Sequence, residues 1–272
     1  MNDTNYNPAR RLHDIISAGP SPGDGITVWN AFSEILGVPV AEPAALWERI
    51  AQVMQLPATI KSAVETIPDI DSELYLTWHP KAIAAAESFN VKSNWKSFAS
   101  NYPPENRMAL NFCADLLSKH HPERRVPDTD LTSLLQQVNQ LIQDLDSVEF
   151  RSTDWHFMYH HLSKVKEVIE SYMVTGIRPL EDAYAQTIGG MAISPNIRAG
   201  LQGSDLGKRF WKAICAVATV LSVYGGISAI THDTLRILNS HEIFQNESPP
   251  ALPSTSSPDV IDAEVVESTN RK

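Results

Sequence analysis

Residues 129–145 read TDLTSLLQQVNQLIQDL, and this stretch decides the fold class. Its apolar residues recur with spacings of three and four, so they share one side of a helix while Gln, Asn, Asp and Ser fill the other. The apolar row is Leu131, Leu134, Leu135, Val138, Leu141, Ile142 and Leu145. A second helix with the same pattern is expected from Thr153 to Val174, ending at Gly176. The two helices should pack as an antiparallel pair.

Shorter helices with prolines between them are expected upstream of this pair. Their ranges are Ile26–Leu36, Ala44–Leu56, Ser72–Ala86, Asn94–Ala99 and Glu105–Lys119. Pro57 is expected to end the second of them. No stretch alternates between apolar and polar residues for long enough to form a strand. The sequence therefore predicts an all-α, multi-helix bundle over residues 1–188, followed by a Gly-rich, irregular connector over residues 189–207.

The next segment, Ala213–Ile230, reads AICAVATVLSVYGGISAI and contains no Asp, Glu, Lys, Arg or His. Extended back to Phe210, it spans about 31 Å as a helix, which is close to the thickness of the hydrocarbon core of a bilayer. We therefore predict a single transmembrane helix over residues 208–240. Lys208, Arg209 and Lys212 precede the uncharged residues, so the positive-inside tendency places the N-terminal domain in the cytoplasm. The alternative is a buried central helix of a helical domain.

Small and weakly polar residues form a stripe along one face of this predicted helix. The stripe consists of Cys215, Thr219, Ser222, Gly226 and Ala229. Such a stripe permits close packing against a second copy of the chain, or it lines a narrow aqueous path. Both interpretations imply a homo-oligomer, as an anchor in the first case and as a pore in the second.

The overall charge and the cysteines exclude several classes of protein. Lys and Arg number 22 against 32 Asp and Glu, which gives a net charge of −10, so broad electrostatic attraction to nucleic acid or anionic lipid is not expected. The two cysteines, Cys113 and Cys215, are too few and too far apart for a disulfide scaffold or a structural zinc site. His156 and His160 lie one helical turn apart but lack further ligands, and no catalytic motif is present. We expect no enzyme activity, no metal and no cofactor.

Basic residues gather between two of the predicted helices and form the candidate ligand site, which we call the basic cluster. Its members are Lys119, His120, His121, Arg124 and Arg125, with Lys164 on the following helix. On an acidic protein such a cluster can bind a phosphate group. Residues 241–272 form a Pro- and Ser-rich acidic tail that is expected to be disordered, and its VIDAEVV stretch (260–266) is a candidate docking peptide.

A helical domain followed by one membrane helix with a small-residue face resembles the transmembrane effectors of bacterial anti-phage defence systems. Three segments carry the resemblance: LTSLLQQVNQLIQDL (131–145), FMYHHLSKVKEVIESYMVTGIRPLEDAYAQTIGG (157–190) and FWKAICAVATVLSVYGG (210–226). The Hailong type is the most similar. In it, a helical membrane effector is held closed by an oligonucleotide that a partner nucleotidyltransferase makes. The resemblance implies an ion channel that depolarises the membrane when its ligand is lost.

Two hypotheses for the function follow. The first is an oligomeric inner-membrane effector, an ion channel gated by a cytoplasmic signal such as a nucleotide or oligonucleotide. The second is a helical interaction or scaffold protein without a pore, either soluble or tethered to a membrane. In the second hypothesis, the stripe on the uncharged segment serves only for packing.

Overall fold

The computed structural model describes residues 6–20, 25–149 and 152–225. Within these ranges the chain forms helices and no strands, which confirms the all-α prediction. The helices are α1 (Pro8–Ser17), α2 (Val28–Leu36), α3 (Pro43–Glu65), α4 (Ser72–Tyr75), α5 (His79–Glu87), α6 (Trp95–Ala99), α7 (Pro104–His120), α8 (Asp128–Asp146), α9 (Thr153–Thr175), α10 (Arg178–Ile193), α11 (Pro195–Gly203) and α12 (Asp205–Tyr224). Several starts and ends lie within two residues of those expected from the pattern.

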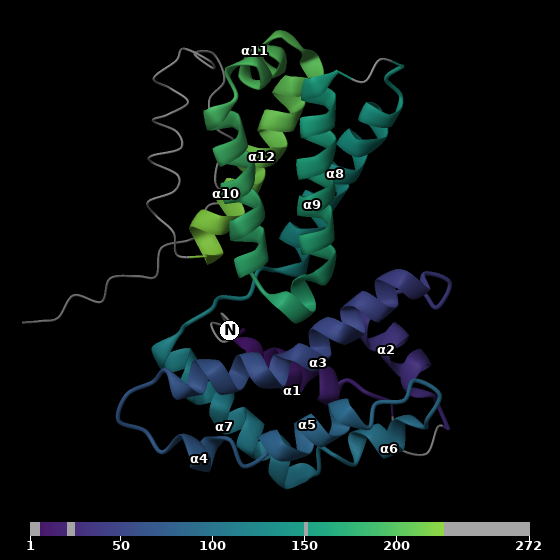
Figure 1. The fold of residues 1–272 in the computed structure, drawn as a ribbon, viewed down its shortest axis with the longest axis vertical. Helices are drawn as coiled ribbons and strands as arrows, with labels where there is room; N and C mark the ends of the chain where they lie inside the picture. The colour runs from purple at the N-terminus through teal and green to yellow at the C-terminus, as the bar shows by residue number, and fades with distance from the viewer. Residues whose placement is uncertain (1–5, 21–24, 150–151, 226–272) are drawn as a thin grey trace, which may run out of the picture.

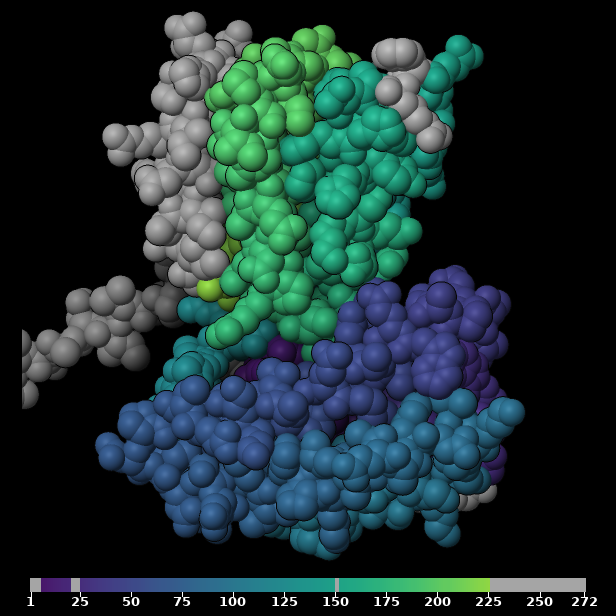
Figure 2. Space-filling view, in the orientation of Figure 1, coloured from purple at the N-terminus to yellow at the C-terminus, as the bar shows by residue number. Residues whose placement is uncertain are grey.

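The helices are arranged around two hydrophobic cores. We call α1–α7 the N-terminal lobe and α8–α12 the C-terminal lobe; Figure 1 shows the first below the second. Figure 2 shows the two lobes meeting where α3 lies beneath the ends of α9 and α10. Each core also contains a side chain from the other part of the chain: Val174 of α9 packs in the N-terminal core, and Tyr6 packs in the C-terminal core.

Local signals account for several helix ends. The Thr27 side chain accepts a hydrogen bond from Asn30 N at the start of α2, and that helix ends at Gly37 with a φ of 65°. Ser152 caps α9 by accepting from Trp155 N. The expected break at Pro57 is wrong, because α3 continues through this residue to Glu65. Pro57 is buried in the core, and the packing of its ring offsets the backbone hydrogen bond that a proline cannot donate.

Residues 189–207, which we expected to form an irregular connector, are instead helical. They belong to the end of α10, to α11 and to the start of α12. The tight turn from α11 into α12 requires a glycine at residue 207, because a Cβ at that position would lie 2.0 Å from the carbonyl oxygen of Leu201. The segment therefore folds back into the C-terminal lobe and brings α12 against α8, α10 and α11.

The uncharged segment begins as a core helix. One side of α12 is buried in the C-terminal core and includes Phe210, Ile214, Val217 and Leu221. Polar contacts hold both ends of α12 to α8: Arg209 pairs with Asp144, and Tyr224 Oη donates to Asp130 Oδ2 at 2.9 Å. Among the helices in the described ranges, none has the length and apolar character needed to cross a bilayer. The remainder of the predicted 208–240 span, from residue 226, lies outside the described residues, as does the predicted tail.

Candidate functional site

One side of α7 carries apolar side chains that the N-terminal core does not cover. Leu110, Cys113 and Leu117 face the core and are buried. Met108 and Phe112 lie on the adjoining side and are 59% and 55% exposed. Their spacing of four places them one above the other on the helix. The helix α7 therefore has one apolar face for its own core and another that is open to the surface.

The short helix α4 forms the opposite wall of a groove beside α7. Leu74, which is 66% exposed, faces the groove together with Tyr75. The cavity has a volume of about 590 Å³, which falls in the usual size range for a ligand pocket. Its lining is completed by Thr77, Glu105, Met108, Ala109, Phe112, Asp115, Leu116 and Lys119. We call this site the α4–α7 groove.

A buried thiol holds the two walls of the groove together. Cys113 Sγ donates to the backbone carbonyl oxygen of Tyr75 at 2.9 Å and accepts from Trp78 Nε1 at 3.3 Å. Burial raises the pKa of the Cys113 thiol above its ordinary value, which keeps the thiol protonated and able to donate. The wall formed by α4 is thereby fixed to α7, so the groove is preformed.

Opposite charges lie at the two ends of the groove. Glu105 lies in the first turn of α7 and Lys119 in its last turn, which are the ends where the helix dipole favours each charge. Asp115, also in the lining, is 3.6 Å from Arg10 of α1. Next to Lys119, His120 and His121 are exposed. The groove therefore has an apolar middle, an acidic end at Glu105 and a basic end at Lys119, with Asp115 in the lining one turn before Lys119.

The structure divides the predicted basic cluster. Lys119, His120 and His121 are exposed beside the groove, whereas Arg124 donates to the carbonyl oxygen of Val223 at 3.2 Å, near the end of α12. Arg125 pairs with Asp128 at 3.5 Å and lies over the ring of Tyr6. These contacts give the two arginines packing roles.

Lys164, the sixth predicted member of the basic cluster, lies on α9 and pairs with a carboxylate of its own helix. Its Nζ is 3.1 Å from Glu167 Oε1. The backbone carbonyl oxygen of Glu167 accepts from Arg49 of α3 at 3.1 Å, so the partner of Lys164 lies at the contact between α3 and α9. Its position is explained by an ion pair at the lobe boundary.

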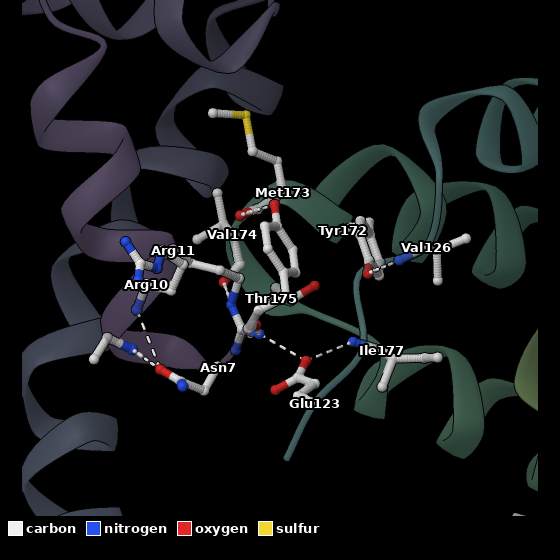
Figure 3. Close-up of polar contacts among 12 residues, drawn as sticks. Asn7, Arg10, Arg11, Glu123, Val126, Tyr172, Met173, Val174, Thr175 and Ile177 are labelled. Carbon is white, nitrogen blue, oxygen red and sulfur yellow. Dashed lines mark hydrogen bonds and ion pairs between the residues drawn. The ribbon is translucent and has the colours of Figure 1, made fainter. Parts of the chain in front are cut away.

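A buried ion pair joins the two lobes (Figure 3). Arg11 Nη1 donates to Glu123 Oε1 at 2.7 Å, and the two side chains are only 4% and 13% exposed. Arg11 also donates to the carbonyl oxygens of Tyr6 and Val174, at 2.7 and 2.9 Å. The same Glu123 oxygen accepts from Ile177 N at 3.2 Å. The pair therefore ties α1 to the chain around Gly176, where α9 passes into α10.

Gly176 is required at this joint for two reasons. Its φ is 73° and its ψ is −159°, a backbone conformation that essentially only glycine adopts. A Cβ at residue 176 would lie 2.2 Å from both Arg11 Nη1 and Glu123 Oε1. Next to the pair, the rings of Tyr6 and Tyr172 stack with centroids 5.4 Å apart, and Tyr172 Oη accepts from Val126 N at 2.7 Å.

The small-residue stripe lies on the outer side of α12, away from the core. Thr219 is exposed, and Cys215 and Ser222 are half-buried. Both hydroxyls bond within the helix: Thr219 donates to the carbonyl oxygen of Cys215 and Ser222 to that of Thr219, each at 2.9 Å. Gly226 and Ala229, the other two predicted members, lie outside the described residues.

The histidines on α9 have few potential metal ligands near them in the described ranges. Over the described parts of the chain, no group of three or more His, Cys, Asp or Glu side chains is arranged to hold a metal ion. His161 Nδ1 and the Thr187 hydroxyl are 3.0 Å apart. Burial, together with the neighbouring His160, lowers the pKa of His161 to about 4. His161 is therefore a neutral packing residue at pH 7.

Comparison of the chain with protein-family models, curated proteins and solved structures finds no match. The case for a function therefore rests on the groove, which the sequence pattern alone did not reveal. One signal for it was present: Met108 and Phe112 fall outside the stripe that Leu110, Cys113 and Leu117 form. A helix with two apolar sides needs two partners, and the N-terminal core supplies one.

Proposed function

We propose that this chain is a helical interaction protein whose N-terminal lobe binds a short amphipathic segment of a protein partner in the α4–α7 groove. The observation that carries the proposal is the exposed apolar row of Leu74, Met108 and Phe112 gathered along one preformed groove. Exposed apolar patches with a polar rim mark sites of association. Because an isolated exposed apolar side chain is ordinary, the clustering of these three carries the argument.

The charges at the groove ends define the chemistry of the segment. An occupant with an acidic residue at one end of its apolar stretch would place that residue beside Lys119. His120 and His121 extend the basic end beyond the groove. The net charge of −10 does not favour acidic peptides at long range, so recognition depends on this local arrangement.

A direct test uses a labelled decapeptide in which valine alternates with glutamate, titrated into the full-length protein and followed by fluorescence anisotropy. Covering the exposed half of Phe112 buries about 100 Å² of apolar surface, which contributes about 2.5 kcal/mol. Phe112→Asp should therefore weaken binding by more than about 50-fold. The matched control is Val40→Asp, which places the same charge on another exposed apolar position and should leave the affinity unchanged. Equal affinities for both variants and the parent would refute the proposal.

The competing proposal is the signal-gated channel in a bacterial inner membrane, assembled from several copies and controlled by a nucleotide or oligonucleotide at the basic cluster. It requires α12 to leave the C-terminal lobe, because the side of α12 opposite the stripe is buried against α8, α10 and α11. Membrane fractionation followed by a dye-based depolarisation assay separates the two. Protein in the membrane fraction together with loss of membrane potential favours the channel, and peptide binding without either favours the interaction protein.

A further inference from the structure

The α4–α7 groove has an occupant of suitable chemistry in the chain itself. We propose that residues 259–271, DVIDAEVVESTNR, bind in the groove of the same molecule and compete there with the segment of a partner. The inference rests on the proposed function of the groove as a peptide site. It adds an intramolecular ligand, and thereby an autoinhibited state.

The apolar residues of this segment match the groove in length. In an extended conformation Ile261, Ala263 and Val265 point to one side, and Asp262 and Glu264 point to the other. The three apolar residues span about 13 Å at roughly 3.3 Å per residue. On α7, the row from Met108 through Phe112 to Leu116 spans about 12 Å at 1.5 Å per residue. One apolar side chain of the segment can therefore meet each apolar residue of α7.

An acidic residue flanks the apolar residues of the segment on each side. Asp259 lies two residues before Ile261, about 7 Å away when extended, and Lys119 lies three residues beyond Leu116, about 5 Å along the helix. An antiparallel arrangement therefore brings Asp259 to Lys119. Glu267 lies two residues after Val265, so a parallel arrangement brings Glu267 to Lys119 instead. In either direction one acidic residue of the segment lies beside Lys119 and the other lies toward Glu105, so the charges allow both directions.

The chain leaves the described part of the structure close enough for this contact. Arg124 donates to the carbonyl oxygen of Val223, and only four residues separate Arg124 from Lys119 at the end of the groove. The point of exit is thus within about 30 Å of the basic end. The 34 residues from 226 to 259 can span up to about 110 Å. A tethered ligand of this kind acts at an effective concentration on the order of 1 mM, so even a weak segment occupies its site.

The test titrates a labelled peptide of residues 259–272 into full-length proteins. In the variant Ile261→Asp/Val265→Asp the tethered segment no longer competes with the added peptide for the groove. The peptide should therefore bind this variant about tenfold more tightly than it binds the parent. The factor is the ratio of an effective concentration of about 1 mM to a dissociation constant of about 0.1 mM for the segment. The matched control Ser256→Asp/Ser257→Asp adds the same two charges outside the segment and should behave as the parent. Equal affinity for the parent and for Ile261→Asp/Val265→Asp would overturn the inference.

A charge reversal tests the direction. Lys119→Glu should weaken binding of the peptide. Recovery on that variant by a peptide carrying Asp259→Lys identifies the antiparallel direction, and recovery by a peptide carrying Glu267→Lys identifies the parallel one. Absence of recovery with both peptides refutes the contact with Lys119. The valine–glutamate decapeptide separates the two proposals. If the decapeptide binds and the 259–272 peptide does not, the intramolecular ligand is refuted and the interaction site stands. If neither peptide binds any of the proteins, both proposals fail.

Discussion

Replacing Gly176 by alanine should break the joint between the two lobes. The new Cβ would lie 2.2 Å from an atom of Arg11 and from an atom of Glu123, so the buried ion pair must separate or the backbone must move. The backbone conformation of residue 176 adds a second cost, because its φ of 73° combined with a ψ of −159° is strained for any side chain. Gly37 provides the matched control, since it also has a positive φ, 65°, but a Cβ added there would have no other atom within 4 Å.

The magnitude follows from these two costs. The backbone strain at residue 176 is about 1–3 kcal/mol. Breaking a buried pair so that one charge loses its partner costs about 3–5 kcal/mol. Gly176→Ala should therefore lower the free energy of unfolding by about 4–8 kcal/mol, a large part of the 5–15 kcal/mol typical of folded domains. Gly37→Ala adds only the left-handed backbone cost, about 1–2 kcal/mol.

Urea unfolding followed by far-UV circular dichroism measures the difference. With a slope of about 3 kcal/mol per molar urea, the midpoint of Gly176→Ala should fall about 1–2 M below that of Gly37→Ala. Because the Arg11–Glu123 pair links the lobes, the variant should also unfold in two transitions where the parent shows one. Midpoints within 0.3 M of each other, roughly the error of such a fit, would refute the reasoning about the joint.

Three further predictions concern the C-terminal lobe. The pKa of His161 is lowered to about 4 in the folded protein, so as the pH falls the imidazole of the unfolded chain is protonated first. The free energy of unfolding should therefore decrease as the pH falls from about 6.5 toward 4. His161→Gln should reduce this decrease, as measured by urea titrations at pH 7 and pH 5. Trp155→Phe removes the 2.8 Å hydrogen bond from the indole to the carbonyl oxygen of Leu145, and thermal unfolding should show a loss of about 1 kcal/mol or more. Burial raises the pKa of the Cys215 thiol to about 11. At pH 8 the native protein should therefore react with a water-soluble disulfide reagent far more slowly than the protein in urea. Rapid modification of the native protein would instead favour a water-lined path along α12.

Long helices with strong periodicity could be predicted from the sequence. The expected ranges for α8 and α9 differ from the observed ones by about one residue at each end. The helices without an expected range are α1, α10 and α11, and in the last two Gly189, Gly190 and Pro195 disrupt the local pattern. Glycine in a helix costs about 1 kcal/mol per residue, which tertiary contacts override, and Pro195 is the first residue of α11, where a proline is tolerated. The α10–α11 region packs on α9 and α12, which local propensity does not register.

The site was harder to predict than the fold, because it depends on which side chains the tertiary structure leaves uncovered. Phe112 and Leu116 are one helical turn apart on the same side of α7, yet Phe112 is 55% exposed and Leu116 is 9% exposed. The other wall of the groove is formed by α4, which is only four residues long and carries no periodic pattern. The basic cluster was visible as a run of charges, but the contacts of Arg124 and Arg125 with α12 and Tyr6 arise only when the lobes are assembled.

A helix without charged residues is compatible with both a membrane and a protein core, which is why the uncharged segment suggested a membrane helix. An uncharged helix is stable wherever its apolar side is removed from water, and a protein core does this as well as lipid does. The reason why α12 packs in the C-terminal core lies in the sequence of the neighbouring helix α8. The apolar row of α8 is broad: Leu134, Val138 and Leu141 are buried, and Leu131, Leu135 and Ile142 pack beside them. One antiparallel neighbour, α9, covers only part of so wide a row. A second apolar helix is therefore needed on the other side of α8, and α12 supplies it.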